Sequence, residues 1–243
     1  MLLSGERIDQ LYAEDVKIIQ SKEVFSFSLD AVLLANFPRL PKKGRIVDLC
    51  AGNGAVGLFI SKKTKAPIIQ IELQSRLADM GKRSIQLNHL EQQLTMHTLD
   101  LKNATSVIKK DSVDLVVCNP PYFKEQTTSQ KNPNIHLAIA RHEIYTTLEE
   151  VIHVSSQLLK TNGRLAMVHR PDRFLDLLNI FEKENIIPKR VQFIYPKQDS
   201  EANTLLIEGI KQGKKAGFRI LPPLILHNEQ NDYEKPIRKM LYG

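Results

Sequence analysis

The sequence predicts a single doubly wound α/β domain with a mostly parallel sheet, and three observations lead to this prediction. Short apolar stretches alternate with stretches of helical periodicity, an order typical of parallel sheets with helices on both faces. The run VDLVVC at residues 113–118 is almost continuously apolar, as in a strand buried on both faces. A glycine-rich stretch, Gly52 to Gly57, directly follows an apolar strand, where such sheets bind ligands.

The first half of the chain is predicted to contain three helices and three strands of this domain. An alternating run precedes residue 29, and apolar residues at helical spacing over residues 29–37 predict a helix that Ser28 or Asp30 caps and Pro38 ends. Apolar stretches and surface-type periodicity then predict alternating strands and helices. The expected strands are residues 44–50, 66–73 and 94–101, and the expected helices are residues 55–64 and 74–90.

The second half begins with the strand at residues 113–118, which two prolines close. Residues 123–139 have no clear period and predict a mobile loop. A helix is expected from Thr146 or Thr147 until Gly163 stops it. Because no helix separates the last two expected strands, one of the seven predicted strands should run antiparallel near the C-terminus. These later elements are a strand at 164–169, a helix at 171–185, and strands at 189–195 and 203–210.

The composition favours a soluble, basic protein. Lys and Arg number 34 against 27 Asp and Glu, so the formal net charge of +7 suggests a polyanionic partner. Cys50 and Cys118 lie in apolar runs, which argues against a disulfide framework or a metal site and favours a reducing, cytoplasmic setting. Glu6, Arg7 and Asp9 interrupt the apolar core that a signal peptide needs, and no run approaches the roughly 18 apolar residues of a membrane span.

The expected organisation is one domain over residues 1–243. Residues 1–25 form an N-terminal extension, residues 26–210 the core, and residues 211–243 a basic C-terminal segment. We find no internal repeat, and we favour a monomer.

The glycine-rich stretch raises a question about the cofactor. Gly52, Gly54 and Gly57 follow the pattern G-x-G-x-x-G, in which glycines let the main chain approach a ligand. Asp48 ends the preceding strand, and Glu72, at the end of the next strand, is placed to accept hydrogen bonds from two ribose hydroxyls. These features suit a nicotinamide dinucleotide and S-adenosylmethionine equally well.

The stretch Asn119-Pro120-Pro121-Tyr122 separates these two cofactors. Two prolines remove two amide donors and stiffen the chain, so Asn119 and the carbonyl of Pro120 are held at fixed positions. Such a pair of acceptors can hold an exocyclic amino group, and Tyr122 offers a flat face on which a base can stack. The simpler interpretation of the same residues is a turn that ends a strand.

These residues, in this order, resemble the class I S-adenosylmethionine-dependent methyltransferases, over roughly residues 20–210. The resemblance rests on DLCAGNG at residues 48–54, Glu72, Asp100 and NPPY at residues 119–122. The NPPY stretch is similar to the motif of the amino-methylating branch. The segment FSFSLDAVLLANF and ARHE at residues 140–143 are similar to bacterial tRNA methyltransferases that modify N6 of adenine 37 in valine tRNA. The resemblance implies a Rossmann-like methyltransferase domain that uses S-adenosylmethionine.

The resemblance also implies a role for individual residues. It implies that Asp48 and the glycines face the methionine part of the cofactor, that Glu72 binds its ribose, and that Asp100 lies beside its adenine amino group. The simpler interpretations are a helix cap for Asp48, a solvent-exposed carboxylate for Glu72 and a turn for Asp100. The catalytic set that it implies is Asn119, Pro120, Pro121 and Tyr122. The cofactor set that it implies is Phe27, Asp30, Asp48, Cys50, Ala51, Gly52, Asn53, Gly54, Glu72, Leu73, Asp100, Leu101 and Asn119.

The chemistry that these residues suit is methylation of a weakly nucleophilic amine. A sulfonium carbon is already electrophilic, so the protein mainly has to align an in-line attack. The oxygen of the Asn119 side chain and the carbonyl of Pro120 would accept the two amine hydrogens and favour a nitrogen that bears its lone pair. No metal is required. A base in a tRNA loop is also inexpensive to unstack.

Basic residues beyond the core are candidates for binding the tRNA. Arg141 and His142 could contact the target nucleotide or a phosphate, or form a structural ion pair. The basic turn near residue 215 is a candidate for phosphate contacts, although a solvated hairpin tip is its default interpretation. Its basic residues are Lys211, Lys214, Lys215 and Arg219.

Several other functions remain open. Glutamine N5-methyltransferases of release factors also carry NPPY, but they resemble chains with a helical domain ahead of the core. DNA adenine methyltransferases usually add a target-recognition domain, for which we see no room, and methylation of guanine N2 in rRNA stays compatible with the motif. A non-catalytic module that binds S-adenosylmethionine or RNA is the alternative outside the enzymes.

Overall fold

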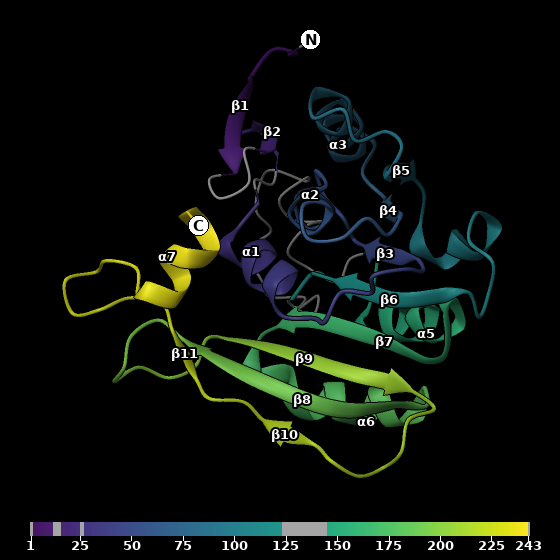
Figure 1. Ribbon diagram of the computed structural model, residues 1–243, viewed down its shortest axis with the longest axis vertical. Coiled ribbons are helices and arrows are strands. Elements are labelled where there is room, and N and C mark those ends of the chain that lie inside the picture. Colours follow the sequence, from purple (N-terminus) through teal and green to yellow (C-terminus); the bar gives the residue numbers. More distant parts are fainter. Residues whose placement is uncertain (1, 12–15, 25–26, 123–144, 243) are drawn as a thin grey trace.

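A computed structural model describes residues 2–11, 16–24, 27–122 and 145–242 (Figure 1). It confirms the α/β class: a nine-stranded sheet has the order β10-β8-β9-β7-β6-β3-β4-β5, and β11 also pairs with β8. The sheet strands are β3 (Ile46–Leu49), β4 (Ile68–Glu72), β5 (Leu94–Thr98), β6 (Val113–Cys118), β7 (Leu159–His169), β8 (Ile186–Tyr195), β9 (Thr204–Lys211), β10 (Arg219–Ile220) and β11 (Leu224–Ile225).

The direction of the strands also agrees with the prediction. β9 pairs antiparallel with both β7 and β8, whereas every other pair in this sheet is parallel. Seven strands correspond to the predicted ones, and β10 and β11 are additions of two residues each. The order in which strands are added to the sheet reverses at β3, because β4 and β5 lie on one side of it and β6 on the other. The carboxyl ends of β3 and β6 therefore meet at a crevice.

Helices cover both faces of the sheet (Figure 1). One apolar core joins α1 (Leu29–Asn36), α2 (Ala55–Ser61), α3 (Ser75–Leu87) and α7 (Lys235–Tyr242) to one face. A second core joins the short helix η2 (Leu101–Ser106), α5 (Leu148–Leu158) and α6 (Phe174–Lys183) to the other face, and the 3₁₀ turn η3 (Pro171–Arg173) leads into α6. Among the described residues, no helix is long and apolar enough to cross a membrane.

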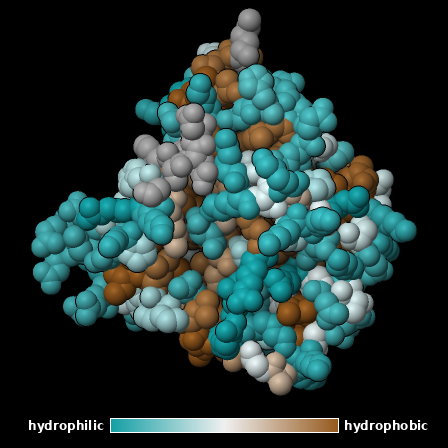
Figure 2. Space-filling view, in the orientation of Figure 1, coloured by the Kyte–Doolittle hydropathy of each residue, from teal (hydrophilic) through white to brown (hydrophobic). Residues whose placement is uncertain are grey.

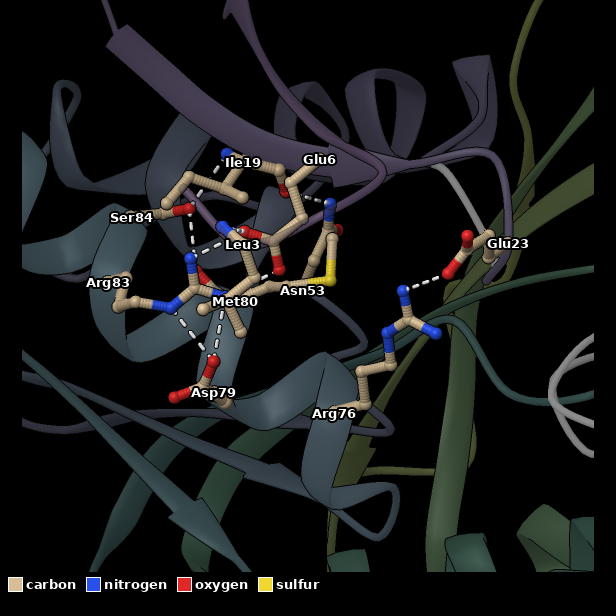
Figure 3. A network of polar contacts seen from close by, with 10 residues as sticks. All are labelled: Leu3, Glu6, Ile19, Glu23, Asn53, Arg76, Asp79, Met80, Arg83 and Ser84. Atoms are coloured by element: carbon tan, nitrogen blue, oxygen red, sulfur yellow. Dashed lines mark hydrogen bonds and ion pairs between the residues drawn. The ribbon is translucent and has the colours of Figure 1, made fainter. Parts of the chain in front are cut away.

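The N-terminal residues form a hairpin of β1 (Glu6–Leu11) and β2 (Val16–Ser21), which packs on α3 through Ile19, Leu77 and Met80. Polar contacts complete this docking (Figure 3). The Arg83 guanidinium contacts both Glu6 and Asp79, and Arg76 contacts Glu23. We call these five charged residues the hairpin network.

The largest differences from the predicted boundaries lie at the end of α5 and the start of β7. The helix expected to run to Gly163 ends at Leu158, and β7 begins at Leu159 and contains Gly163. A Cβ atom at Gly163 would lie 2.8 Å from the Lys160 carbonyl oxygen and 2.9 Å from that of Val113, so the glycine permits a close main-chain approach inside the strand. The start of the helix follows the prediction, because Thr147 and Glu150 form a reciprocal capping box.

The first helix also begins where expected. Ser28 is its N-cap, but the Ser28 hydroxyl donates to the Asp30 carboxylate, 3.1 Å away, and makes no cap hydrogen bond. The predicted loop at residues 123–139 lies outside the described residues. The division of the chain into extension, core and basic segment stays a prediction.

Candidate active site

A cavity of about 410 Å³ lies at the carboxyl ends of β3, β4 and β6. Its size and mostly apolar lining are typical of a site for a small molecule or cofactor. It brings together most of the residues predicted from the sequence. Those that line it are Phe27, Asp30, Cys50, Ala51, Gly52, Asn53, Glu72, Leu73, Leu101, Asn119, Pro120, Pro121 and Tyr122.

The glycine loop exposes its main chain to this cavity. Gly52 has φ +57°, a conformation that favours glycine, and a Cβ atom there would meet nothing within 4 Å. The open space beside Gly52 therefore lets a ligand approach the main chain. Gly57 serves packing instead, because a Cβ atom there would lie 2.4 Å from the Gln70 amide nitrogen.

Glu72 lies at the end of β4, only 6% exposed. Its Oε2 accepts a hydrogen bond from the Gly52 amide, and its Oε1 accepts one from the Gln74 amide, both at 2.8 Å. Burial raises the pKa of Glu72. A carboxylate has about four lone-pair positions, so both oxygens can still accept hydrogen bonds from ribose hydroxyls.

Asp48 lies behind the glycine loop and does not line the cavity. It is fully buried in β3, accepts a hydrogen bond from Gln70 Nε2 at 3.0 Å, and has a pKa raised by burial to about 7. The same Gln70 nitrogen is 3.2 Å from the Gly54 carbonyl oxygen. Asp48 and Gln70 thus support the loop from the side of α2.

Three more predicted contacts take a different form. Gly54 does not line the cavity and is the N-cap of α2. Asp100 does not line it either: its Oδ1 accepts a hydrogen bond from the Lys102 amide at 2.9 Å and caps η2. The Asn53 side chain is buried, and its amide nitrogen donates to the Ile19 carbonyl of the hairpin, 3.1 Å away, so this nitrogen joins the loop to the hairpin.

The NPPY corner forms the wall of the cavity beyond β6. The Tyr122 hydroxyl is 2.6 Å from Asn119 Oδ1 and 3.0 Å from Asp30 Oδ2, and burial raises the pKa of Tyr122. One hydroxyl hydrogen cannot serve two acceptors. If the Asn119 amide is rotated by 180°, its nitrogen donates to Tyr122 and Tyr122 donates to the Asp30 carboxylate, so every contact is satisfied. This orientation frees the Asn119 oxygen for another donor.

His169 backs this corner. Its ring lies 5.2 Å from the Tyr122 ring, centroid to centroid, and it is fully buried at the end of β7. Its Nδ1 accepts a hydrogen bond from the Arg170 amide at 2.8 Å, and burial lowers its pKa to about 4. His169 is therefore neutral at physiological pH and supports the tyrosine ring as a packing residue.

The predicted tRNA-binding residues do not gather at this cavity. Arg141 and His142 lie outside the described residues. Lys211 is the last residue of β9. Because β9 runs antiparallel to its neighbours, Lys211 lies at the end of the sheet opposite to the cavity. Its Nζ contacts Asp111 Oδ1 at 2.6 Å and the Leu159 carbonyl oxygen at 2.8 Å. Three other predicted residues are exposed: Lys214, Lys215, which pairs with Glu182, and Arg219, which lines a second cavity.

Sequence reasoning missed part of the lining. Tyr145 and Thr146 border the cavity just ahead of α5, and Gln74 and Leu99 stand next to predicted acidic positions. Their position in the sequence could have identified them, because each lies within two residues of a strand end or helix start that was already predicted. In the part of the chain that the structure describes, no group of three or more His, Cys, Asp or Glu residues is arranged to hold a metal.

Comparisons with known proteins agree with this fold. Over 212 residues the chain is 26% identical to a tRNA1(Val) (adenine(37)-N6)-methyltransferase of Bacteroides fragilis, covering 86% of this chain and 88% of that protein. A protein of the same name from Photobacterium profundum is 27% identical over 186 residues, covering 74% of this chain and 75% of that protein.

Solved structures are similar as well. A predicted O-methyltransferase from Agrobacterium tumefaciens has a TM-score of 0.70 at 22% identity, covering 88% of this chain and 95% of that chain. Geranyl diphosphate C-methyltransferase from Streptomyces coelicolor, solved with S-adenosyl-L-homocysteine, has a TM-score of 0.57 at 13% identity, covering 74% and 76%. The model of the methyltransferase small domain matches residues 15–194. The chain belongs to the methyltransferase small domain family.

Proposed function

We propose that this protein transfers a methyl group from S-adenosylmethionine to the N6 amine of adenine in RNA, with adenine 37 of valine tRNA as the substrate. The observation that carries the proposal is that Asn119 and Pro120 share one cavity with Gly52 and Glu72. A pair of rigid acceptors for an amine thus lies beside a loop suited to an adenosine cofactor. The names of the relatives from Bacteroides and Photobacterium support the choice of tRNA.

The lining residues fit S-adenosylmethionine. The Glu72 carboxylate would accept hydrogen bonds from the ribose, the open main chain at Gly52 would face the methionine part, and Leu101 would pack against the adenine ring. Phe27 and Asp30 would border the methionine end. When bound, the cofactor supplies an electrophilic methyl carbon, and the complex of the Streptomyces relative supports a cofactor of this chemistry.

The residues of the chain act on the amine. The Asn119 oxygen and the Pro120 carbonyl would accept hydrogen bonds from the two hydrogens of the N6 amine, which orients its lone pair toward the methyl carbon. Formation of the nitrogen–carbon bond would break the bond between the methyl group and sulfur, leave a neutral thioether, and release one amine proton to water. With the Asn119 amide in the rotated orientation, the Tyr122 hydroxyl, held by Asp30, would accept from the amide nitrogen and leave this oxygen turned toward the amine. Tyr122, backed by His169, offers its ring to the base.

The main alternative is methylation of a glutamine amide in release factors, because an amide nitrogen needs the same two acceptors. The net charge of +7 favours a polyanionic substrate over this alternative.

The first prediction tests Asn119. With labelled S-adenosylmethionine and tRNA that lacks the modification, we expect N6-methyladenine, and Asn119→Ala should lower the rate by about 100-fold or more because a positioned polar contact is lost. Asn179→Ala, an exposed site on α6, is the matched control. Binding of S-adenosylmethionine should be retained in Asn179→Ala, and in Asn119→Ala it should fall much less than the rate does.

Separate reactions with release factor, DNA and rRNA distinguish the substrates. Methyl transfer to glutamine in place of tRNA would replace the proposed function, and equal rates for Asn119→Ala and the wild type would remove Asn119 from the mechanism. Cofactor binding without turnover on any of these pools would support the non-catalytic alternative. Tighter binding of NADH than of S-adenosylmethionine would overturn the choice of cofactor.

A further inference from the structure

A second cavity, of about 280 Å³, lies on the face of the sheet that carries α1, beside the C-terminal end of that helix. Figure 2 shows that hydrophilic side chains cover most of the molecular face seen in Figure 1, with apolar side chains in separate patches. The lining of the cavity is dominated by charge. Its charged residues are Arg39, Arg164, Lys189, Arg190, Arg219 and Glu208, and together they define what we call the basic cavity.

The strand register explains why these residues converge. Arg190 in β8 stands opposite Glu208 in β9 and opposite Arg219 in β10. Arg164 in β7 stands opposite Ile210, two residues beyond Glu208 on the same face of β9. Arg39 comes from the segment that follows α1. Three strands, β7, β8 and β10, and one loop therefore direct basic side chains to one place, and β9 between them contributes Glu208.

The charges in the basic cavity do not balance. Glu208 is matched by Arg190, whose Nε and Nη2 lie 3.0 Å and 3.1 Å from its two oxygens. Lys189 donates to the main-chain carbonyls of Lys214 and Ala216, which are neutral, so it keeps its full charge. One carboxylate thus faces five basic side chains.

The three remaining cations complete this imbalance. Within the described ranges, no carboxylate forms an ion pair with Arg39, Arg164 or Arg219. Gathering like charges is unfavourable unless an anion neutralises them. Guanidinium groups match the oxygens of phosphate in pairs, and none of the described residues that line the cavity is aromatic and able to stack on a base.

We propose that the basic cavity binds backbone phosphates of the RNA substrate. This inference rests on the proposed function, because it assigns a docking surface to the same RNA. Three strand spacings of about 4.8 Å separate β6 from β8, and a fourth leads to β10, so the basic cavity lies about 15–20 Å from Asn119 along the sheet. A folded RNA spans that distance, whereas a single nucleotide does not.

The proposal also changes which basic residues contact RNA. Of the residues expected from the sequence, only Arg219 lines the basic cavity, and Lys211 and Lys215 pair with Asp111 and Glu182. Arg39 and Arg164 take their place. Phosphate contacts position the substrate without reading its bases.

The second prediction tests the basic cavity with a triple variant, Arg39→Gln, Arg164→Gln and Arg219→Gln. Losing three phosphate contacts should lower the affinity for unmodified tRNA about 100-fold at 0.1 M salt, and the slope of log K against log salt should become shallower by about 2 to 3. Fluorescence anisotropy over a salt series measures both. The KM for tRNA should rise, while kcat at saturating tRNA is retained.

The control variant removes equal charge elsewhere: Lys62→Gln, Lys65→Gln and Lys109→Gln are exposed and lie outside the basic cavity. An equal loss of affinity in both triple variants would overturn the proposal, since only net charge would then matter. Binding of S-adenosylmethionine and the unfolding midpoint exclude a folding defect. Failure of the proposed function is distinguishable: tRNA would bind at the basic cavity with the predicted salt slope but would not be methylated.

Discussion

The hairpin network and the basic cavity are both polar and both join segments far apart in the sequence, yet their charges are organised differently. In the hairpin network, Arg83 contacts Glu6 and Asp79, and Arg76 contacts Glu23, so cations and carboxylates alternate (Figure 3). In the basic cavity, Glu208 is matched by one arginine, and among the described residues no carboxylate pairs with Arg39, Arg164 or Arg219. Matched charges dock one element on another, and unmatched charges of one sign indicate a ligand that supplies the opposite sign.

The third prediction breaks the hairpin network and has the largest expected effect on stability. The Glu6 side chain is 1% exposed and that of Arg83 16%, so Arg83→Met leaves a buried carboxylate without its main cation. We expect the free energy of unfolding to fall by about 3 kcal/mol in urea titrations. Arg7→Met is the control, because Arg7 and Asp9 are partly exposed and their pair should contribute less than about 1 kcal/mol.

The same pair predicts a pH dependence. The hydrogen bond from Arg83 lowers the pKa of Glu6 below its ordinary value of 4.5. A carboxylate whose pKa is lowered by folding stabilises the protein above the unfolded pKa and loses this contribution as the pH falls through the folded pKa. The difference between wild type and Arg83→Met should therefore shrink below pH 4.5. A difference that stays constant down to pH 3 would contradict the role of Glu6.

The fourth prediction concerns Asp48, a fully buried carboxyl group that accepts a hydrogen bond from the neutral Gln70 amide. Burial raises its pKa from 3.8 to about 7, so the folded state binds a proton more tightly than the unfolded state, and stability is lost as the pH rises from 3.8 to 7. Asp48→Asn removes this loss. Its amide can also donate to Gln70 Oε1, an atom without a partner among the described residues.

We therefore expect Asp48→Asn to be more stable than wild type at pH 8 by about 1–3 kcal/mol and to show a flatter pH profile. Asp172→Asn, at an exposed position, should change neither quantity. Chemical unfolding between pH 4 and pH 8 checks both variants. A less stable Asp48→Asn at pH 8 would mean that the charged carboxylate itself stabilises the glycine loop.

The fifth prediction has the smallest effect and the opposite sign to that of Arg83→Met. Arg164→Gln removes one of the unmatched cations, so without RNA the free energy of unfolding should rise by about 0.3–0.5 kcal/mol at low salt. The gain should vanish near 1 M salt, where the Debye length is only about 3 Å. A loss of stability at low salt would mean that Arg164 is paired with an anionic group, as in the hairpin network, and would contradict the difference between the two regions.

Periodicity predicted most of the fold because each strand and helix buries a face that its own residues define. The alternation of β3 could have predicted the direction of Asp48 as well, since Ile46 and Asp48 share a face and Val47 and Leu49 share the other. The end of α5 was predicted wrongly, because Gly163 signals a helix stop locally and its reason, the nearby Val113 carbonyl, comes from another strand.

In the candidate site, the spacing of residues along the sequence predicted a residue's position in the cavity only where that residue lies at or just after the end of a strand. Gly52, Glu72 and Asn119 were found this way, because the carboxyl ends of neighbouring parallel strands converge. The partners of Lys211 and Lys215 were not predictable, since Asp111 and Glu182 are distant in sequence and are brought near only by the tertiary fold.

The hydrogen bond from Asn53 to the Ile19 carbonyl fastens the glycine loop to the hairpin. Whatever stiffens the loop should also reduce the motion of β2, so cofactor binding should slow the exchange of hairpin amides with deuterated water, although none of the described hairpin residues lines the cavity. The N-terminal strands would then report on cofactor occupancy from outside the site.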